Sequence, residues 1–381
     1  MTRSTPATAR AVVLTMVFLA ASLVMSTDLG AASAPVTGRP CSRSERGTLR
    51  VVGRVTLRCA TERGRRVWVI RTPTTSTMGT TSTMGTTSTS VTTLSTTPPE
   101  AGITQGAHTV RFGSKDRRYV VHLPGGRTPQ TPGALVVVLH GGLGGAEQAQ
   151  TAYGWDAVAD GAGFTVVYPE GPAVAIGHAW NAGTCCGAPS SENVDDVGFV
   201  QSVVDILIAA KVADSRRLYL TGMSNGAMLA YRMACDRPGR YAAIGPVSGT
   251  IVSDCAQLAP VSLLHIHGLA DRNIPFDGSP SSKGLNLATT YLPVPRAVDR
   301  FRTAARCAAA SVVAEGPVTR SHSSCPAGID VELITIDGAG HQWPGSKVQP
   351  SDSALRLGVD PPSTALHATA ELWAFFERHR R

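Results

Sequence analysis

The sequence contains no apolar run long enough to cross a membrane. The run near the N-terminus, Ala11–Met25, has about 15 residues, whereas a spanning helix needs about 20. Basic residues precede this run and small residues follow it at positions 31–34, which is the pattern of a signal peptide. We therefore expect residues 1–34 to be removed and the mature chain to be secreted and extracellular, without a membrane span.

Charged side chains are scarce as well. They make up 16% of the chain against 43% hydrophobic residues, a balance that excludes an intrinsically disordered protein and predicts a folded one with a large core. Nearly all of the net charge of +8 lies in residues 41–71, which hold nine arginines and two glutamates, whereas residues 101–381 hold 23 basic and 23 acidic side chains. The larger part of the chain is thus neutral overall, and nucleic acid is a poor partner for a secreted chain.

The sequence also lacks the spacing of a zinc site, because Cys185, Cys186 and His178 do not match it. We expect neither a metal nor an organic cofactor. Eight cysteines, an even number, fit an oxidising compartment. Proximity along the chain pairs Cys41 with Cys59, Cys235 with Cys255 and Cys307 with Cys325, and a vicinal disulfide is one arrangement of the remaining Cys185 and Cys186.

What is present divides the chain further. Residues 35–71 alternate apolar and polar side chains, which predicts two or three strands in a small basic module pinned by one disulfide. Residues 72–102 are rich in Thr and Ser, repeat the hexapeptide TTSTMG and cannot bury a core, so we interpret them as a linker. The module either binds an anionic cell-wall or polysaccharide surface or has a solvated basic face without a partner, and the sequence leaves both open.

Apolar strands and helical patterns alternate in the remaining residues, 103–381. Such alternation predicts an α/β fold in which a mostly parallel sheet is covered by helices on both faces. The strands are expected near 107–112, 118–123, 134–139, 164–168, 217–221, 242–247, 261–267 and 331–336, and the helices near 146–162, 197–212, 225–236, 295–308 and 364–379.

Residues 220–226, LTGMSNG, place Ser224 in a GxSxG frame between an apolar strand and a helix-like stretch. Gly222 and Gly226 remove the side chains that would collide in a sharp strand-to-helix turn, which leaves the serine oxygen exposed above the sheet. This is the context of a nucleophile elbow. Ser224 is therefore the candidate nucleophile.

A second glycine-rich segment, HGGLGG at 140–145, follows the buried strand expected at 134–139. Glycines in such a loop allow backbone N–H groups to approach a developing oxyanion. We expect the two donors to be the N–H groups of Gly142 and Asn225. A flexible turn after the strand is the alternative interpretation of the loop.

Asp271 follows the strand at 261–267, and His341 lies on a glycine-flanked loop after the strand at 331–336. With Ser224 they give the chain order Ser, Asp, His of an α/β hydrolase. The imidazole would accept the serine proton, and the carboxylate would hold the imidazole in the required tautomer. Asp277 and Asp337 remain alternative acids, whereas His140, His265 and His267 are expected to be hydrogen-bonded structural groups.

Six blocks occur in one order along the chain: HGG at 140–142, WNAGTCCG at 180–187, VDDVGF at 194–199, GMSNGAM at 222–228, HIHGLAD followed by IP at 265–275, and GAGHQWPG at 338–345. Together they resemble the bacterial esterase family that includes polyhydroxybutyrate depolymerase-like and feruloyl esterase-like secreted enzymes. The resemblance covers about residues 105–381. It implies an α/β-hydrolase fold and ester hydrolysis through an acyl-enzyme on the serine, aspartate and histidine named above. A catalytically silent binding protein and a serine peptidase on the same scaffold are the alternatives.

Aromatic and amide side chains beside these blocks are candidates to wall the acyl or alcohol pocket, although each fits simple packing equally well. Flat rings suit an aromatic acyl group or a sugar face, so we expect feruloyl or acetyl esters of plant polysaccharide ahead of polyhydroxyalkanoates. The candidates are Tyr153, Trp180, Asn181, Gln342 and Trp343, and the pair Asp195 and Asp196 is expected to cap the helix that follows it.

Overall fold

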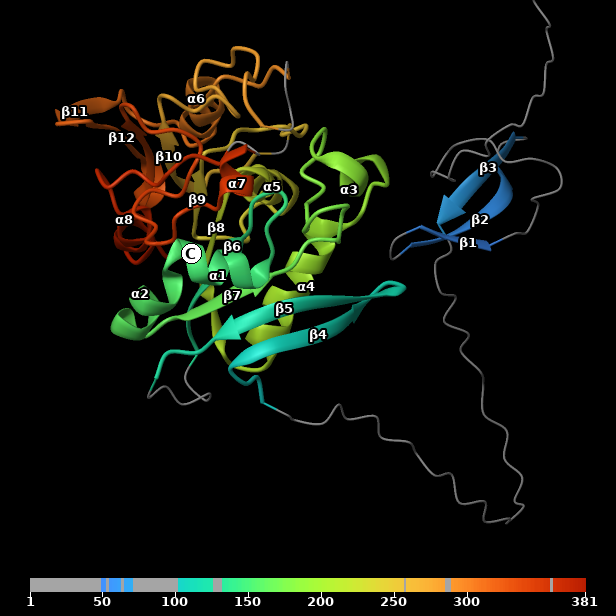
Figure 1. Cartoon of the computed structure of the whole chain (residues 1–381). Coiled ribbons are helices and arrows are strands. Elements are labelled where there is room, and N and C mark those ends of the chain that lie inside the picture. Colours follow the sequence, from blue (N-terminus) through green and yellow to red (C-terminus); the bar gives the residue numbers. More distant parts are fainter. Residues whose placement is uncertain are drawn as a thin grey trace, which may run out of the picture. The chain divides into compact units, whose positions relative to one another are not determined.

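The computed structural model describes residues 49–52, 55–62, 65–70, 102–125, 132–256, 258–284, 289–356 and 359–381. The chain divides into two compact units between Ser95 and Thr96. The first contains an antiparallel sheet in the order β1 (Leu49–Val52), β2 (Val55–Glu62) and β3 (Arg65–Ile70), as expected for the small module (Figure 1). The expected signal peptide, most of the linker and the pairing of Cys41 with Cys59 lie outside the described residues.

The second unit is built on a ten-stranded sheet. Its six central strands are parallel, and an antiparallel pair lies at each edge, so the expectation of a mostly parallel sheet is confirmed. The order across the sheet is β11 (Ser311–Glu315), β12 (Val318–Cys325), β13 (Ile329–Ile336), β10 (Ser262–Gly268), β9 (Ala243–Val247), β8 (Ala213–Met223), β6 (Gly133–Leu139), β7 (Thr165–Pro169), β5 (Lys115–His122) and β4 (Gly106–Phe112).

Helices cover both faces of this sheet (Figure 1). Each face carries its own buried cluster, one around Phe199, Tyr231 and Phe301 and the other around Trp155 and Phe376. None of the helices in the described ranges is long and apolar enough to span a membrane. The helices are α1 (Ala146–Tyr153), α2 (Trp155–Ala162), α3 (Gly187–Ser191), α4 (Asp196–Ala209), α5 (Asn225–Asp236), α6 (Val294–Ala304), α7 (Asp352–Arg356) and α8 (Ala368–Phe376).

This arrangement is the α/β-hydrolase fold: parallel strands buried on both faces, joined by helices. Strand β6 illustrates why the sequence adopts it. Residues Ala134–Leu139 are all buried, so an uninterrupted apolar run is needed instead of alternating polar residues. The carboxyl ends of β6, β8, β10 and β13 lead into the loops that carry the expected functional residues.

Several boundaries differ from the sequence-based prediction. The helix expected at 146–162 is two helices, because Gly154 has a left-handed φ of 70° and ends α1. Strand β8 is longer than the predicted 217–221 because it begins at Ala213. Strands β11 and β12 and the short helices α3 and α7 were not predicted at all, and β11 is exposed along its whole length, so it carries no burial pattern.

Three disulfides are present in the described residues. Cys235 pairs with Cys255 and Cys307 with Cys325, with Cα–Cα distances of 5.2 and 4.0 Å, which confirms both expected pairings. The adjacent Cys185 and Cys186 are bonded to each other. The vicinal arrangement considered from the sequence is therefore the one in the structure.

Candidate active site

Ser224 lies at the turn between the end of β8 and the start of α5. Its φ of 55° and ψ of −119° mark the sharp turn expected of a nucleophile elbow. The turn packs so closely on β6 that a Cβ on Gly222 would lie 2.8 Å from the carbonyl oxygen of Leu139. A Cβ on Gly226 would collide with the same carbonyl. Only glycine fits at both positions, which explains the GxSxG spacing physically.

Ser224, His341 and Asp271 form one hydrogen-bonded chain. His341 Nε2 lies 2.9 Å from Ser224 Oγ, and His341 Nδ1 lies 2.7 Å from Asp271 Oδ2. The carboxylate can only accept, so Nδ1 carries the proton and Nε2 is free to accept the serine proton. His341 is 70 positions from Asp271 and 117 positions from Ser224 in the sequence. The fold thus brings the three residues together in the geometry that activates a serine nucleophile.

Asp271 is held by three hydrogen-bond donors. Besides the imidazole of His341, the backbone N–H groups of Asn273 and Ile274 donate to Asp271 Oδ1 at 2.9 Å each, and His267 Nε2 lies 3.5 Å from Oδ2. Burial raises the pKa of this carboxyl, but the charge and hydrogen bond of His341 and the neighbouring donors outweigh burial and bring the pKa below its usual value. Asp271 therefore stays ionised beside the histidine.

The alternative acids occupy other surroundings. Asp277 Oδ1 accepts from the backbone N–H of Ser279, 2.9 Å away, and Asp337 is exposed on the loop after β13. Within the described ranges neither has a hydrogen bond to His341. This geometry favours Asp271 as the acid.

A line of buried side chains extends from the acid into the core. His267 Nε2 donates to the carbonyl of Ile274 at 2.9 Å, His265 Nε2 donates to His267 Nδ1 at 3.0 Å, and the hydroxyl of Tyr231 donates to His265 Nδ1 at 2.7 Å. Burial is the largest effect on both imidazoles and lowers their pKa, so both are neutral. They act as hydrogen-bonded structural groups.

His140 is also structural. Its Nδ1 donates to the carbonyl of Gly141 at 2.8 Å, and its Nε2 accepts from the backbone N–H of Gly171 at 3.0 Å. Burial lowers its pKa to about 4. The imidazole therefore fixes the start of the glycine-rich loop as a neutral group.

The glycine-rich loop lies against the nucleophile. A Cβ on Gly141 would be 3.7 Å from Ser224 Cβ, and one on Gly142 would be 3.7 Å from Asn225 Cβ. Asn225 is the first residue of α5, where backbone N–H groups have no partner inside the helix. Gly142 and Asn225 thus lie close together beside the elbow, and their N–H groups stay the candidate donors to a developing oxyanion.

Trp180 and Asn181 form hydrogen bonds with the backbone of neighbouring segments. Trp180 is fully buried, and its indole Nε1 donates to the carbonyl of His140 at 2.9 Å. The amide of Asn181 donates to the carbonyl of Val194 at 2.9 Å. Their burial does not support the expectation that these side chains wall a substrate pocket.

Tyr153 and Trp343 are likewise buried and stack on each other with ring centroids 4.3 Å apart. The Tyr153 hydroxyl accepts from the N–H of Gly141 at 3.2 Å, and the Trp343 indole donates to Thr369 Oγ1 at 3.0 Å. Tyr153 therefore holds the glycine-rich loop in place, and Trp343 packs against Tyr153. Gln342 is buried too, and neither polar atom of its side-chain amide has a hydrogen-bond partner among the described residues.

Two acidic residues near the site have roles that the motifs did not reveal. Asp196 is fully buried and pairs with Arg117 at 2.8 Å, in addition to accepting from the N–H of Asn181. Asp360 accepts from the backbone N–H of His341 at 2.7 Å. Asp195, in contrast, caps α4 as expected, by accepting from the N–H of Gly198 at 2.8 Å. Arg117 lies in β5 beside Lys115, Asp116 and Arg118, so no local pattern indicates the buried ion pair.

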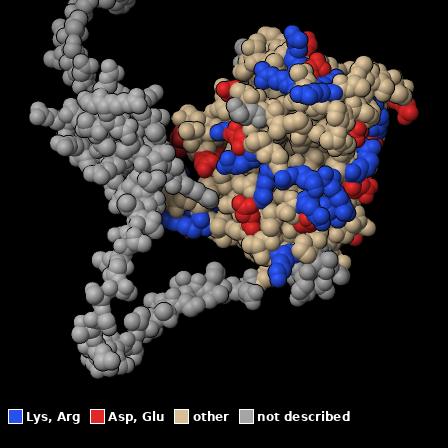
Figure 2. All heavy atoms as spheres, turned by 180° about the vertical axis from the view of Figure 1, so that it is seen from behind, with Lys and Arg blue, Asp and Glu red and all other residues tan. Residues whose placement is uncertain are grey.

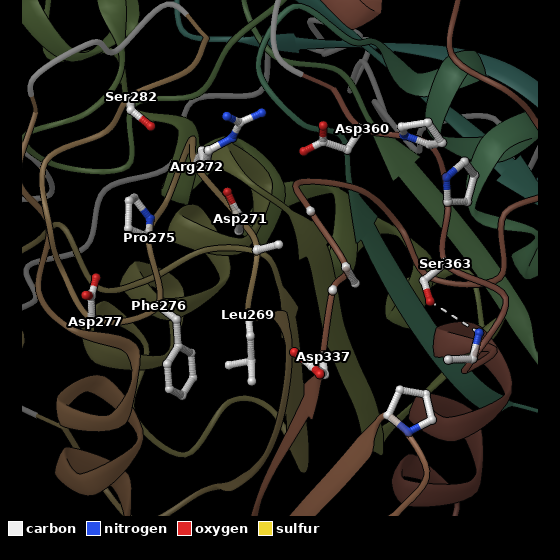
Figure 3. A pocket seen from close by; sticks show the side chains of 18 of the residues that line it. Leu269, Asp271, Arg272, Pro275, Phe276, Asp277, Ser282, Asp337, Asp360 and Ser363 are labelled. Carbon is white, nitrogen blue, oxygen red and sulfur yellow. Dashed lines mark hydrogen bonds between the residues drawn. The ribbon is translucent and has the colours of Figure 1, made fainter.

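A cavity of about 1250 Å³ adjoins the acid side of the triad (Figure 3). Leu269, Arg272, Asp337 and Asp360 lie around it, together with Asp271 itself, while Ser224 is not part of its lining. In the described ranges, no group of three or more histidine, cysteine or acidic side chains could hold a metal ion.

Known proteins resemble this chain at several levels. A family model described as Esterase PHB depolymerase matches residues 117–274. The protein NocK of Nocardia uniformis subsp. tsuyamanensis, which is named as an esterase, is 33% identical over 273 residues, or 65% of this chain and 76% of that protein. Feruloyl esterase C of Emericella nidulans is 30% identical over 183 residues, or 46% of this chain and 61% of that enzyme. Among solved structures, an acetyl xylan esterase from Aspergillus awamori aligns with a TM-score of 0.47 and 16% identity, over 65% of this chain and 96% of that one.

The matched residues include the glycine-rich loop, the elbow and the segment that carries Asp271. The similarity to NocK extends over most of that protein, so it concerns a whole catalytic unit rather than one motif. The chain therefore belongs to the Esterase PHB depolymerase family and is a carboxylic ester hydrolase.

Proposed function

We propose that this chain is a secreted serine esterase that works through an acyl-enzyme. The observation that carries the proposal is the continuous hydrogen-bonded chain from Ser224 through His341 to Asp271, with Gly142 and Asn225 beside it as the proposed oxyanion donors. The basic and apolar pattern at the N-terminus supports export, and the disulfides fit an oxidising compartment.

The mechanism follows from these atoms. Ser224 Oγ attacks the ester carbonyl carbon while His341 Nε2 takes the serine proton, and the carbonyl oxygen becomes an oxyanion that accepts from the two N–H groups. As the tetrahedral intermediate collapses, the imidazolium gives its proton to the leaving alcohol oxygen. Water, deprotonated by His341, then attacks the acyl-serine and releases the acid. Asp271 stays ionised and stabilises the imidazolium in both halves.

The substrate we propose is an ester on a polymer, with polysaccharide-linked feruloyl or acetyl groups ahead of polyhydroxyalkanoate chains. Relatives named feruloyl esterase and acetylxylan esterase support the first class, and the description of the matched family supports the second. Residues 101–381 hold 23 basic and 23 acidic side chains, and both kinds appear on the face in Figure 2, so the net charge gives no preference for a charged substrate.

A comparison of two insoluble substrates tests which class of ester the enzyme prefers. The enzyme is incubated with feruloylated arabinoxylan and with polyhydroxybutyrate granules, and released ferulate and hydroxybutyrate are quantified. We expect ferulate to exceed hydroxybutyrate, and hydroxybutyrate without ferulate would reverse the proposed preference. A chromogenic short-chain ester and a dipeptide, assayed in parallel, separate an esterase from a peptidase and from a catalytically silent protein.

Replacing the triad residues tests the mechanism. Ser224→Ala and His341→Ala should each lower kcat on a short-chain ester about a million-fold, since each removes the nucleophile or its base. Asp271→Asn should lower kcat about ten-thousand-fold, because an amide no longer holds the required tautomer.

Asp277→Asn and Asp337→Asn are the matched controls, and both should retain the activity of the unmodified enzyme. If either of them lost activity while Asp271→Asn kept it, the assignment of the acid would be wrong.

A further inference from the structure

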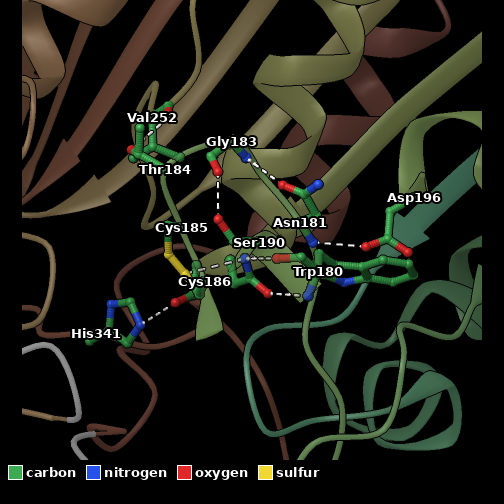
Figure 4. The surroundings of a disulfide bond; sticks show 12 residues. Trp180, Asn181, Gly183, Thr184, Cys185, Cys186, Ser190, Asp196, Val252 and His341 are labelled. Carbon is green, nitrogen blue, oxygen red and sulfur yellow. Dashed lines mark hydrogen bonds between the residues drawn. A yellow bond between two sulfur atoms is a disulfide. The ribbon is translucent and has the colours of Figure 1, made fainter. Parts of the chain in front are cut away.

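The vicinal disulfide lies beside the nucleophile elbow (Figure 4). The side-chain amide of Asn225, the residue that follows the nucleophile, donates from Nδ2 to Cys186 Sγ at 3.4 Å. A cystine at this place touches the residue whose backbone N–H serves the oxyanion.

The side chain of Asn225 is fully engaged by the segment that contains the disulfide. Its Oδ1 accepts from the N–H of Trp180 at 2.7 Å, and its Nδ2 donates to the carbonyl of Trp180 at 3.1 Å as well as to Cys186 Sγ. Asn225 is 3% exposed, so these bonds form away from water and are stronger for it. The position of Asn225 therefore depends on the conformation of residues 180–186.

Residues 180–186 form a closed turn. The N–H of Cys186 donates to the carbonyl of Trp180 at 3.2 Å, and the N–H of Ala182 donates to the carbonyl of Cys185 at 2.6 Å. The covalent bond between adjacent side chains removes rotational freedom from both cysteines. Thr184, between these bonds, is fixed from outside by two hydrogen bonds to the carbonyl of Val252, each 2.9 Å.

Trp180 of the same turn also contacts the start of the glycine-rich loop that carries Gly142, the other proposed donor. The indole of Trp180 donates to the carbonyl of His140, which directly precedes the loop of Gly141 and Gly142. One short segment thus holds Asn225 on one side and the glycine-rich loop on the other.

We propose that the Cys185–Cys186 cystine is a positioning element of the oxyanion hole, which acts through Asn225 and Trp180. The inference rests on the serine mechanism proposed above. The oxyanion exists only in the transition state, so loosened donors should lower kcat and leave ground-state binding almost unchanged. A displacement of about 1 Å at a reacting centre costs up to about a hundred-fold in rate.

The first experiment compares two double variants on a short-chain ester. In Cys185→Ser/Cys186→Ser we expect kcat to fall about ten- to hundred-fold with KM within about two-fold of the unmodified enzyme. The control, Cys307→Ser/Cys325→Ser, removes a disulfide whose Cys325 pairs with Ile329 at the start of β13, about 20 Å along that strand from the end that leads to His341. The control should lose thermal stability and keep its kcat.

A second measurement distinguishes positioning from a general structural role. Affinity for a trifluoromethyl ketone that forms a tetrahedral adduct on Ser224 should fall by the same factor as kcat/KM, while affinity for the product acid should not change. Asn225→Ala combined with the cystine variant should show strong non-additivity, because both changes break one connection.

The outcomes separate the two proposals. If the unmodified enzyme hydrolyses no ester and Ser224 does not react with the ketone, the serine mechanism itself fails. If the unmodified enzyme is active and the cystine variant keeps its kcat while losing only melting temperature, the positioning inference is overturned. A rise in KM at unchanged kcat would overturn it as well, because the cystine would then contact the substrate.

Discussion

His140 is a buried, neutral imidazole beside the site, and its protonation makes the stability of the fold depend on pH. Burial lowers its pKa from 6.5 to about 4. Between these values the unfolded chain binds a proton that the folded chain does not, so the free energy of unfolding falls as the pH drops from about 6.5 to about 4. Above this window the contribution is constant, and the fold keeps the neutral ring that Gly171 requires as acceptor.

His140→Gln should therefore flatten the acid dependence of stability. Removing one such group should reduce the slope of the unfolding free energy by about 1.4 kcal/mol per pH unit between pH 4.5 and 6. Urea unfolding at a series of pH values measures this slope for both proteins. An identical slope in the variant would show that His140 is protonated in the folded chain.

At the residue scale, motifs predicted the side chains that form the hydrogen-bonded chain of Ser224, His341 and Asp271, because a serine mechanism requires fixed residue types in a fixed chain order. The residues that hold these groups were less visible. The pairing of Arg117 with Asp196 and the capping of His341 by Asp360 depend on contacts between distant segments, which leave no local pattern. For the same reason the sequence could not distinguish packing from substrate contact for Trp180 or Trp343, and their burial favours packing.

At the element scale, the junction of β8 and α5 depends on Gly222 and Gly226, because there is no room for a side chain at either position. Gly226→Ala should destabilise the protein by about 1–3 kcal/mol and reduce ester hydrolysis, since the new methyl group collides with backbone carbonyls that cannot move independently of β6. Unfolding in urea and kcat on a short-chain ester measure the two effects.

Gly161→Ala is the matched control. Gly161 lies within α2, and a Cβ there would meet nothing within 4 Å, so alanine should stabilise the helix by about 0.5–1 kcal/mol. Equal effects of the two substitutions would argue against a tight junction at the elbow.

The central strands and the long helices were predictable because burial on both faces gives long apolar runs, as in β6. The hairpin of β11 and β12 was not, since Ser311–Glu315 is exposed and pairs only through its backbone with β12. The break of the helix at Gly154 was missed because glycine within a helical pattern also occurs without ending the helix.

At the scale of the whole molecule, the two compact units should act independently. Deleting residues 35–100 from the mature chain should leave kcat/KM on a small ester within about two-fold, because the catalytic residues all lie in the unit that begins at Thr96. If the basic module binds an anionic surface, retention on cell-wall material should instead be lost, and in the full chain it should fall steeply between 0.1 and 1 M salt as screening shortens the reach of charges from about 10 to about 3 Å. A change in small-ester hydrolysis would contradict independence, and retention that ignores salt would contradict a charge-based role for the basic module.

Helix α8 covers part of one face of the sheet, over β8 and β9. Gly245 of β9 has no side chain, and the space it leaves is filled by Leu372 and Phe376 of α8, whose Phe376 ring also stacks on Tyr219 at 5.0 Å. During synthesis β8 and β9 emerge from the ribosome before α8 does, so this part of their apolar face is covered only once α8 has formed. For the export proposed above this order is favourable, because the nascent catalytic unit stays open enough to be threaded through a translocation channel until α8 has packed on β9.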